Sequence, residues 1–142
     1  MAQAEKWALE GIKAIMNLSF QGTSATERLE LFFFSNDANS SVSSTNSDFT
    51  ELGTSTGFGR IELNKSGFSN ADVTTGTSSI VYTMYNGTTG LAFTALSSFN
   101  MYGYAIRSKT LQNIYYSKNV GLHAMQATDV YTINPLQLQM EI

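Results

Sequence analysis

Apolar and polar residues alternate through the end of the chain, in the stretch NPLQLQMEI. One face of an extended segment is therefore apolar and the other polar, which predicts a C-terminal strand. The apolar positions are Leu136, Leu138, Met140 and Ile142, and Pro135 precedes them, where a missing N–H costs least. Termini fray unless a sheet or a partner holds them, so this strand either closes the protein's own sheet or helps to build an assembly.

At the other end of the chain, apolar residues recur at three- and four-residue spacing. They are Ala4, Trp7, Ala8, Gly11, Ile12, Ile15 and Met16, and they describe one face of a helix from about residue 3 to 17. We predict an N-terminal helical arm within residues 1–20. A lone amphipathic helix needs apolar surface to cover, so this one either lies on the protein's own sheet or docks against a neighbouring subunit.

Between these ends the sequence predicts a series of short strands. They are Arg28–Phe34, Phe58–Leu63, Ser78–Tyr85, Leu91–Ala95, Phe99–Ser108, Ile114–Ser117 and Val130–Ile133. Asn86-Gly87 favours a type I′ hairpin between two of them, because both residues tolerate positive φ. Such strands, with seven tyrosines and nine phenylalanines to pack between sheets, indicate an all-β, antiparallel β-sandwich or jelly roll over residues 28–142.

A long polar loop, residues 35–57, interrupts this series of strands. Loops beyond about 12 to 15 residues are usually functional or mobile, so it is either a contact arm or a flexible excursion. Phe49 and Leu52 indicate that its second half is held in place.

Length and composition narrow the class of protein. A chain of 142 residues is one domain by size and buries roughly two thirds of its unfolded surface. It has no cysteine, and only 13% of its residues are charged, against about 25% in an ordinary soluble domain. A net charge of −3 argues against binding to nucleic acid or to an anionic membrane, since both need clustered Lys and Arg. Glu5, Lys6, Glu10 and Lys13 interrupt the N-terminal apolar residues, so we expect neither a signal peptide nor a spanning helix there.

Candidate chemistry is sparse. His123 is the single histidine, and a zinc site needs three or four ligands, so we expect a structural or surface role for it. Serines abound, but no G-x-S-x-G elbow is present, and the GTSTGFG stretch lacks the lysine of a P-loop. Oxygen ligands for calcium occur in residues 36–48 without the spacing of an EF-hand.

Two pairs of acids are close in sequence, Glu27 with Glu30 and Asp48 with Glu51. Glycoside hydrolysis would need two carboxyls flanking a cleft, and the ordinary interpretation of both pairs is solvated acids. The strand tyrosines are interpreted as core and cross-strand packing rather than as a sugar site. The sequence therefore predicts no enzyme and no catalytic, cofactor or metal site.

Several short motifs follow one another along nearly the whole chain. They are AEKWALEGIKAI, RLELFFFSND, the strand Gly57–Leu63, Gly103–Ile106 followed by the paired aromatics after Ile114, and the segment from Pro135 to Ile142. In this order they resemble small jelly-roll virion proteins of tailed bacteriophages.

The resemblance implies a capsid decoration (cement) protein on the capsid surface of the virion, made in the host cytoplasm. Such a protein self-assembles as a homotrimer, binds the major capsid protein and bridges its subunits without doing chemistry. The alternative is a tail- or fibre-associated module that binds a receptor or a carbohydrate, which would favour exposed aromatics in loops.

The contact residues we predict are Trp7, Ile12 and Ile15 in the helix, Phe49 and Leu52 in the loop, and Leu138, Met140 and Ile142 in the last strand. For Trp7 and Ile12, ordinary core packing is the competing interpretation.

Overall fold

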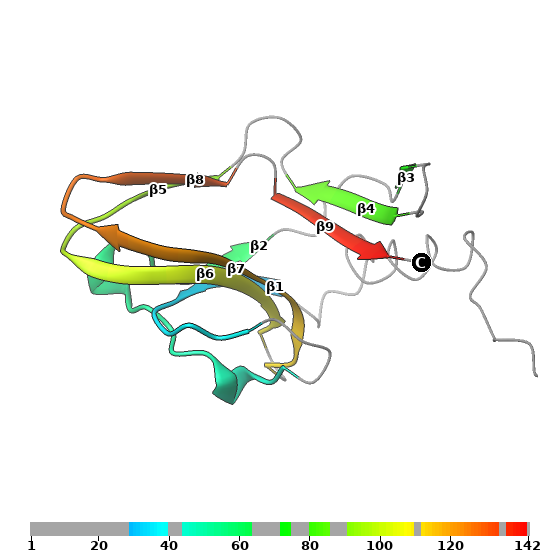
Figure 1. Ribbon diagram of the computed structural model, residues 1–142, viewed down its shortest axis with the longest axis horizontal. Coiled ribbons are helices and arrows are strands. Elements are labelled where there is room, and N and C mark those ends of the chain that lie inside the picture. Colours follow the sequence, from blue (N-terminus) through cyan, green and yellow to red (C-terminus); the bar gives the residue numbers. More distant parts are fainter. Residues whose placement is uncertain are drawn as a thin grey trace, which may run out of the picture. The chain divides into compact units, whose positions relative to one another are not determined.

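The computed structural model describes residues 29–39, 44–63, 72–74, 80–85, 91–109, 112–133 and 136–141. The strands are β1 (Leu29–Phe34), β2 (Ile61–Leu63), β3 (Asp72–Thr74), β4 (Ile80–Tyr85), β5 (Leu91–Thr94), β6 (Phe99–Ser108), β7 (Ile114–Met125), β8 (Val130–Ile133) and β9 (Leu136–Glu141), with the 3-10 turns η1 (Asn46–Asp48) and η2 (Thr54–Thr56) (Figure 1). Every strand pair is antiparallel, which confirms the predicted all-β class.

The predicted N-terminal helix, with Trp7, Ile12 and Ile15, lies outside the described residues. In the part of the chain that the structure describes, no helix is long and apolar enough to cross a membrane.

The contacts divide the chain into two compact units. Unit 1 comprises residues 1–23, 65–90 and 134–142, and unit 2 comprises residues 24–64 and 91–133. Unit 1 contains a three-stranded sheet in the order β3-β4-β9, and unit 2 contains a four-stranded sheet, β2-β1-β6-β7, and a two-stranded ribbon, β5-β8.

The C-terminal strand pairs within the protein's own chain. β9 lies antiparallel to β4 over six residue pairs, from Tyr85 opposite Leu136 to Ile80 opposite Glu141. The last strand therefore belongs to a sheet of the protein's own chain, as one of the two alternatives for the alternating pattern predicted. It forms one edge of the three-stranded sheet β3-β4-β9. Leu138 and Met140 lie within β9, and Ile142 lies outside the described residues.

Three antiparallel pairs are nested along the chain. β6 pairs with β7, β5 pairs with β8 around them, and β4 pairs with β9 around those. The predicted hairpin at Asn86-Gly87 is therefore wrong, because β4 pairs with β3 and β9 while β5 pairs with β8. A type I′ turn joins strands across two residues, whereas β4 ends at Tyr85 and β5 begins at Leu91.

β1 is the centre of unit 2, and its six side chains are all buried. Because strand side chains alternate, Leu29, Leu31 and Phe33 share one face, and Glu30, Phe32 and Phe34 share the other. On the first face the ring of Phe33 lies 4.7 Å from Phe93 of β5 and 6.2 Å from Tyr131 of β8. The four-stranded sheet and the β5–β8 ribbon therefore pack together through aromatic side chains.

The second face of β1 is covered by the long polar loop. The ring of Phe49 lies 4.8 Å from Phe34 and 5.9 Å from Phe32. Gly103 of β6, opposite Phe34, makes room for this packing, because a Cβ there would lie 2.6 Å from the Phe34 ring and 2.1 Å from the Lys118 carbonyl. Only glycine fits at that position.

Three strands differ from the prediction. β2 begins at Ile61 rather than at the predicted Phe58, β7 continues beyond the predicted end at Ser117 to Met125, and β3 was not predicted at all. The β7 residues after Ser117 include a bulge, which breaks the alternation on which the prediction depended.

Candidate functional site

The predicted loop contacts, Phe49 and Leu52, lie in the core of unit 2. They are 8% and 7% exposed, and the Leu52 N–H donates to the Phe33 carbonyl at 2.9 Å. The second half of the polar loop is thus held in place, as its apolar residues indicated. Little of either side chain is left for a partner, so we do not assign them to an interface.

Beside these aromatics, the loop is fastened to the sheet by a buried arginine. Arg107 of β6 lies opposite Glu30 of β1, its side chain is 3% exposed, and its Nε donates to Glu30 Oε1 at 2.7 Å. The other two guanidinium nitrogens donate at 2.6 Å to Asn46 Oδ1 and to Glu51 Oε1. The guanidinium also lies 4.3 Å from the centre of the Phe32 ring, a cation–π distance. Arg107 therefore joins the sheet to two points of the loop.

A second arginine, Arg60, lies beside the same two carboxylates, Glu30 and Glu51. Arg60 Nε lies 3.0 Å from Glu51 Oε2, and Arg60 Nη1 lies 3.8 Å from Glu30 Oε1. Two carboxylates are thus matched by two guanidiniums, and buried charges require such partners. We name Glu30, Glu51, Arg60 and Arg107 the charge cluster. The interpretation of Glu30 and Glu51 as solvated acids is wrong, because their side chains are only 4% and 23% exposed.

One end of unit 2, here named the tip, is made of the β5–β6 turn (residues 95–98) and the β7–β8 turn (residues 126–129), which lie at the left in Figure 1. The two turns bond to each other: the Ala95 N–H donates to the Asp129 carbonyl, and the Thr128 N–H donates to the Ala95 carbonyl, each at 2.8 Å. The η2 turn joins them, because the Leu96 N–H donates to the Thr56 carbonyl at 2.8 Å. The tip is therefore a fixed structure.

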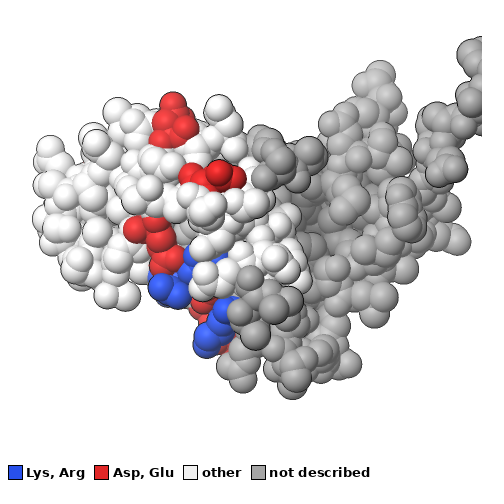
Figure 2. Space-filling view, turned by 90° about the horizontal axis from the view of Figure 1, so that it is seen from below, with Lys and Arg blue, Asp and Glu red and all other residues white. Residues whose placement is uncertain are grey.

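Apolar side chains project from this region. Among the described residues, the exposed large apolar side chains are Leu96 (66% exposed), Val130 (60%), Leu122 (57%) and Tyr115 (43%). Leu96 lies in one turn of the tip, and Val130 directly follows the other. Figure 2 shows acidic and basic side chains next to each other on one face of unit 2, whereas the left end of that face shows neither. The tip thus exposes the aliphatic side chains of Leu96 and Val130 beside one acid, Asp129, whose Oδ2 accepts from the Gln126 N–H at 2.9 Å.

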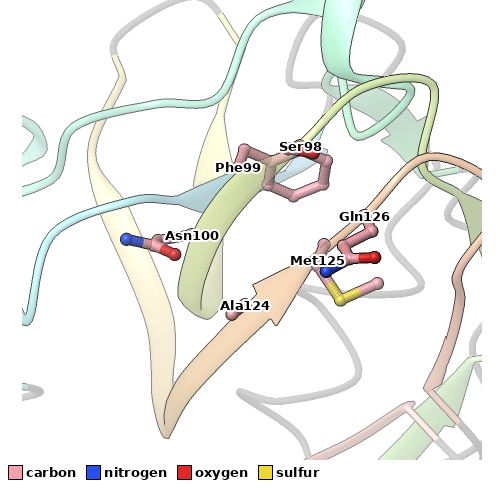
Figure 3. Close-up of a pocket in the computed structure, with 6 residues that line it drawn as sticks. All are labelled: Ser98, Phe99, Asn100, Ala124, Met125 and Gln126. Carbon is pink, nitrogen blue, oxygen red and sulfur yellow. The ribbon is translucent and has the colours of Figure 1, made fainter.

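A shallow pocket of about 360 Å³ opens at the same end of the unit. It is lined by Ser98, Phe99 and Asn100 from the start of β6 and by Ala124, Met125 and Gln126 from the end of β7 (Figure 3). The lining is uncharged, with a hydroxyl and two amides next to a ring and a thioether. Such a pocket suits an uncharged group with an apolar body.

The bulge in β7 includes the exposed Leu122, two residues before Ala124 of the pocket lining. Met101 lies opposite His123, and Gly103 lies opposite Asn119, so three residues of β7 face one of β6. Gly121 adopts φ +82, and its N–H donates to Asn119 Oδ1 at 2.8 Å. The Asn119 amide in turn donates to the Ala38 carbonyl at 2.9 Å. The Asn119 side chain thus anchors the bulge, and bulges of this kind redirect side chains.

His123 follows the bulge and makes local contacts. Its Nδ1 lies 3.0 Å from the Gly121 carbonyl oxygen, and its ring packs edge-on against Tyr131 at 5.4 Å. Among the described residues, no three His, Asp or Glu side chains gather as metal ligands would. These contacts agree with the structural role expected of this histidine.

Three tyrosines of unit 2 have perturbed phenols. Burial raises the pKa of Tyr104 far above its usual value, and the neighbouring phenols of Tyr116 and Tyr131 add to that rise. Burial also raises the pKa of Tyr116 and of Tyr131. All three phenols stay neutral at physiological pH, which suits the packing role predicted for Tyr104 and Tyr116.

Comparison with known proteins adds nothing to this geometry: no family model, no curated protein and no solved structure matches the chain.

Sequence reasoning missed both the charge cluster and the tip. The signal for the first was present, because Glu30 and Arg107 each stand within an otherwise apolar strand segment, LELFFF and FNMYGYAIRS. A charge inside a buried strand needs a buried partner. For the tip, the signal was Leu96, an aliphatic residue in a serine-containing turn.

Proposed function

We propose that this protein is a structural component of a tailed-phage virion, namely a capsid decoration protein that bridges major capsid subunits. The nesting of β6–β7 within β5–β8 within β4–β9 carries the proposal. Folding one long antiparallel hairpin into two layers produces this order of pairs, and it is the order expected of a jelly roll. The jelly roll is in turn the fold that the resemblance to phage virion proteins implies.

The surface of unit 2 supports a role in contact rather than in chemistry. Interface cores are depleted in charged residues, and the tip exposes Leu96 and Val130 with Asp129 as the one charged residue of its two turns. The acids that come together in the structure, Glu30 and Glu51, are engaged by guanidiniums. A carboxyl held in such ion pairs is poorly suited to donate a proton to a glycosidic oxygen. The proposal therefore assigns no catalysis to the chain.

The test uses capsids assembled from the major capsid protein of the phage that encodes this chain, emptied of their own decoration protein. The purified full chain is added, the capsids are pelleted, and the bound protein is quantified. We expect saturable binding at a fixed ratio to the capsid subunit, together with a higher temperature of capsid disruption. Protein that stays in the supernatant at all concentrations would contradict the proposal.

A second candidate is a tail- or fibre-associated module that binds a receptor or carbohydrate. The pocket at the tip favours it, because a hydroxyl and two amides beside apolar groups match an uncharged sugar. Sugar sites usually also stack the sugar on an exposed aromatic ring, and the only ring lining this pocket is the partly buried Phe99. A glycan array separates the two candidates, since a decoration protein is expected to bind no glycan and a receptor-binding module is expected to bind a defined subset.

A further inference from the structure

We draw no further inference here: the strongest candidate, the shallow pocket at the tip of unit 2 with the exposed side chains of Leu96 and Val130 beside it, carries no proposal, because nothing in the described part of the structure shows what occupies or covers it.

Discussion

Replacing Arg107 with methionine tests whether the charge cluster holds the polar loop to the sheet. Methionine retains much of the apolar length of arginine but has no donor, so the three short contacts to Glu30, Asn46 and Glu51 are lost together. Glu30 then remains 4% exposed, with Arg60 at 3.8 Å as the remaining cation of the cluster. The substitution thus isolates the cost of leaving a buried carboxylate poorly paired.

The expected loss is large. Breaking a buried ion pair by removing one partner costs about 3–5 kcal/mol, against a total stability of about 5–15 kcal/mol for a domain. Lys109→Met is the matched control, because its 3.1 Å pair with Glu62 is half exposed and contributes about 0–1 kcal/mol. The double variant Glu30→Met/Arg107→Met removes both charges, and it is expected to cost less than the single arginine change.

Urea unfolding followed by circular dichroism measures these differences. With a slope of about 1–3 kcal/mol per molar urea, Arg107→Met lowers the midpoint by about 1–5 M, while Lys109→Met moves it little. Hydrogen exchange gives the location of the effect: the Leu52 and Ser35 amides, which bond across the loop, are expected to lose protection first. If Arg107→Met cost no more than Lys109→Met, the cluster would not be what fastens the loop.

Two further substitutions test the packing around β6. Gly103→Ala places a Cβ 2.1 Å from the Lys118 carbonyl, where backbone must move, so we expect a loss of at least about 3 kcal/mol or failure to fold. Gly53→Ala, whose Cβ would meet its nearest atom at 4.0 Å, is the control and should change the urea midpoint little. Burial raises the Tyr104 pKa, so above about pH 10 the unfolded chain releases the phenol proton first and stability falls as pH rises. Tyr104→Phe should make that alkaline decline shallower, by up to about 1.4 kcal/mol per pH unit, and an unchanged slope in urea titrations between about pH 9 and 11 would contradict the assignment.

The strands could be predicted where apolar and aromatic residues dominate a short segment. β1, β6 and β8 lie within a residue of their predicted bounds, because LELFFF, FNMYGYAIRS and VYTI each carry a strong local preference for extended structure. β3 has only Asp72–Thr74 and no alternation to reveal it. The end of β7 was missed because its bulge inserts residues that shift the polar and apolar faces.

The partners of the strands and the members of the charge cluster depend on contacts between residues far apart in sequence, which a local sequence pattern does not predict. Asn86-Gly87 favours a turn conformation, but the partner of β4 is β9, more than fifty residues later in the chain. Likewise Arg107 meets Glu30 across 77 positions of sequence. A lone charge within an apolar strand does indicate that a partner exists. It does not identify the partner, because strand order decides which of the other charges comes into register.

The pocket and the charge cluster of unit 2 lie at opposite ends of β6. Phe99 at the pocket and Arg107 in the charge cluster are eight residues apart, about 26 Å at ~3.3 Å per residue of strand. Perturbations more than about 10 Å apart with no shared partner are usually independent. The charges therefore fasten the polar loop at one end without placing an ion pair in the surface at the other, where any charge would have to be desolvated on contact. A strand that starts at a rigid tip and is anchored by a buried arginine at its far end holds the exposed side chains of that tip in fixed positions, which agrees with the structural role proposed for this protein.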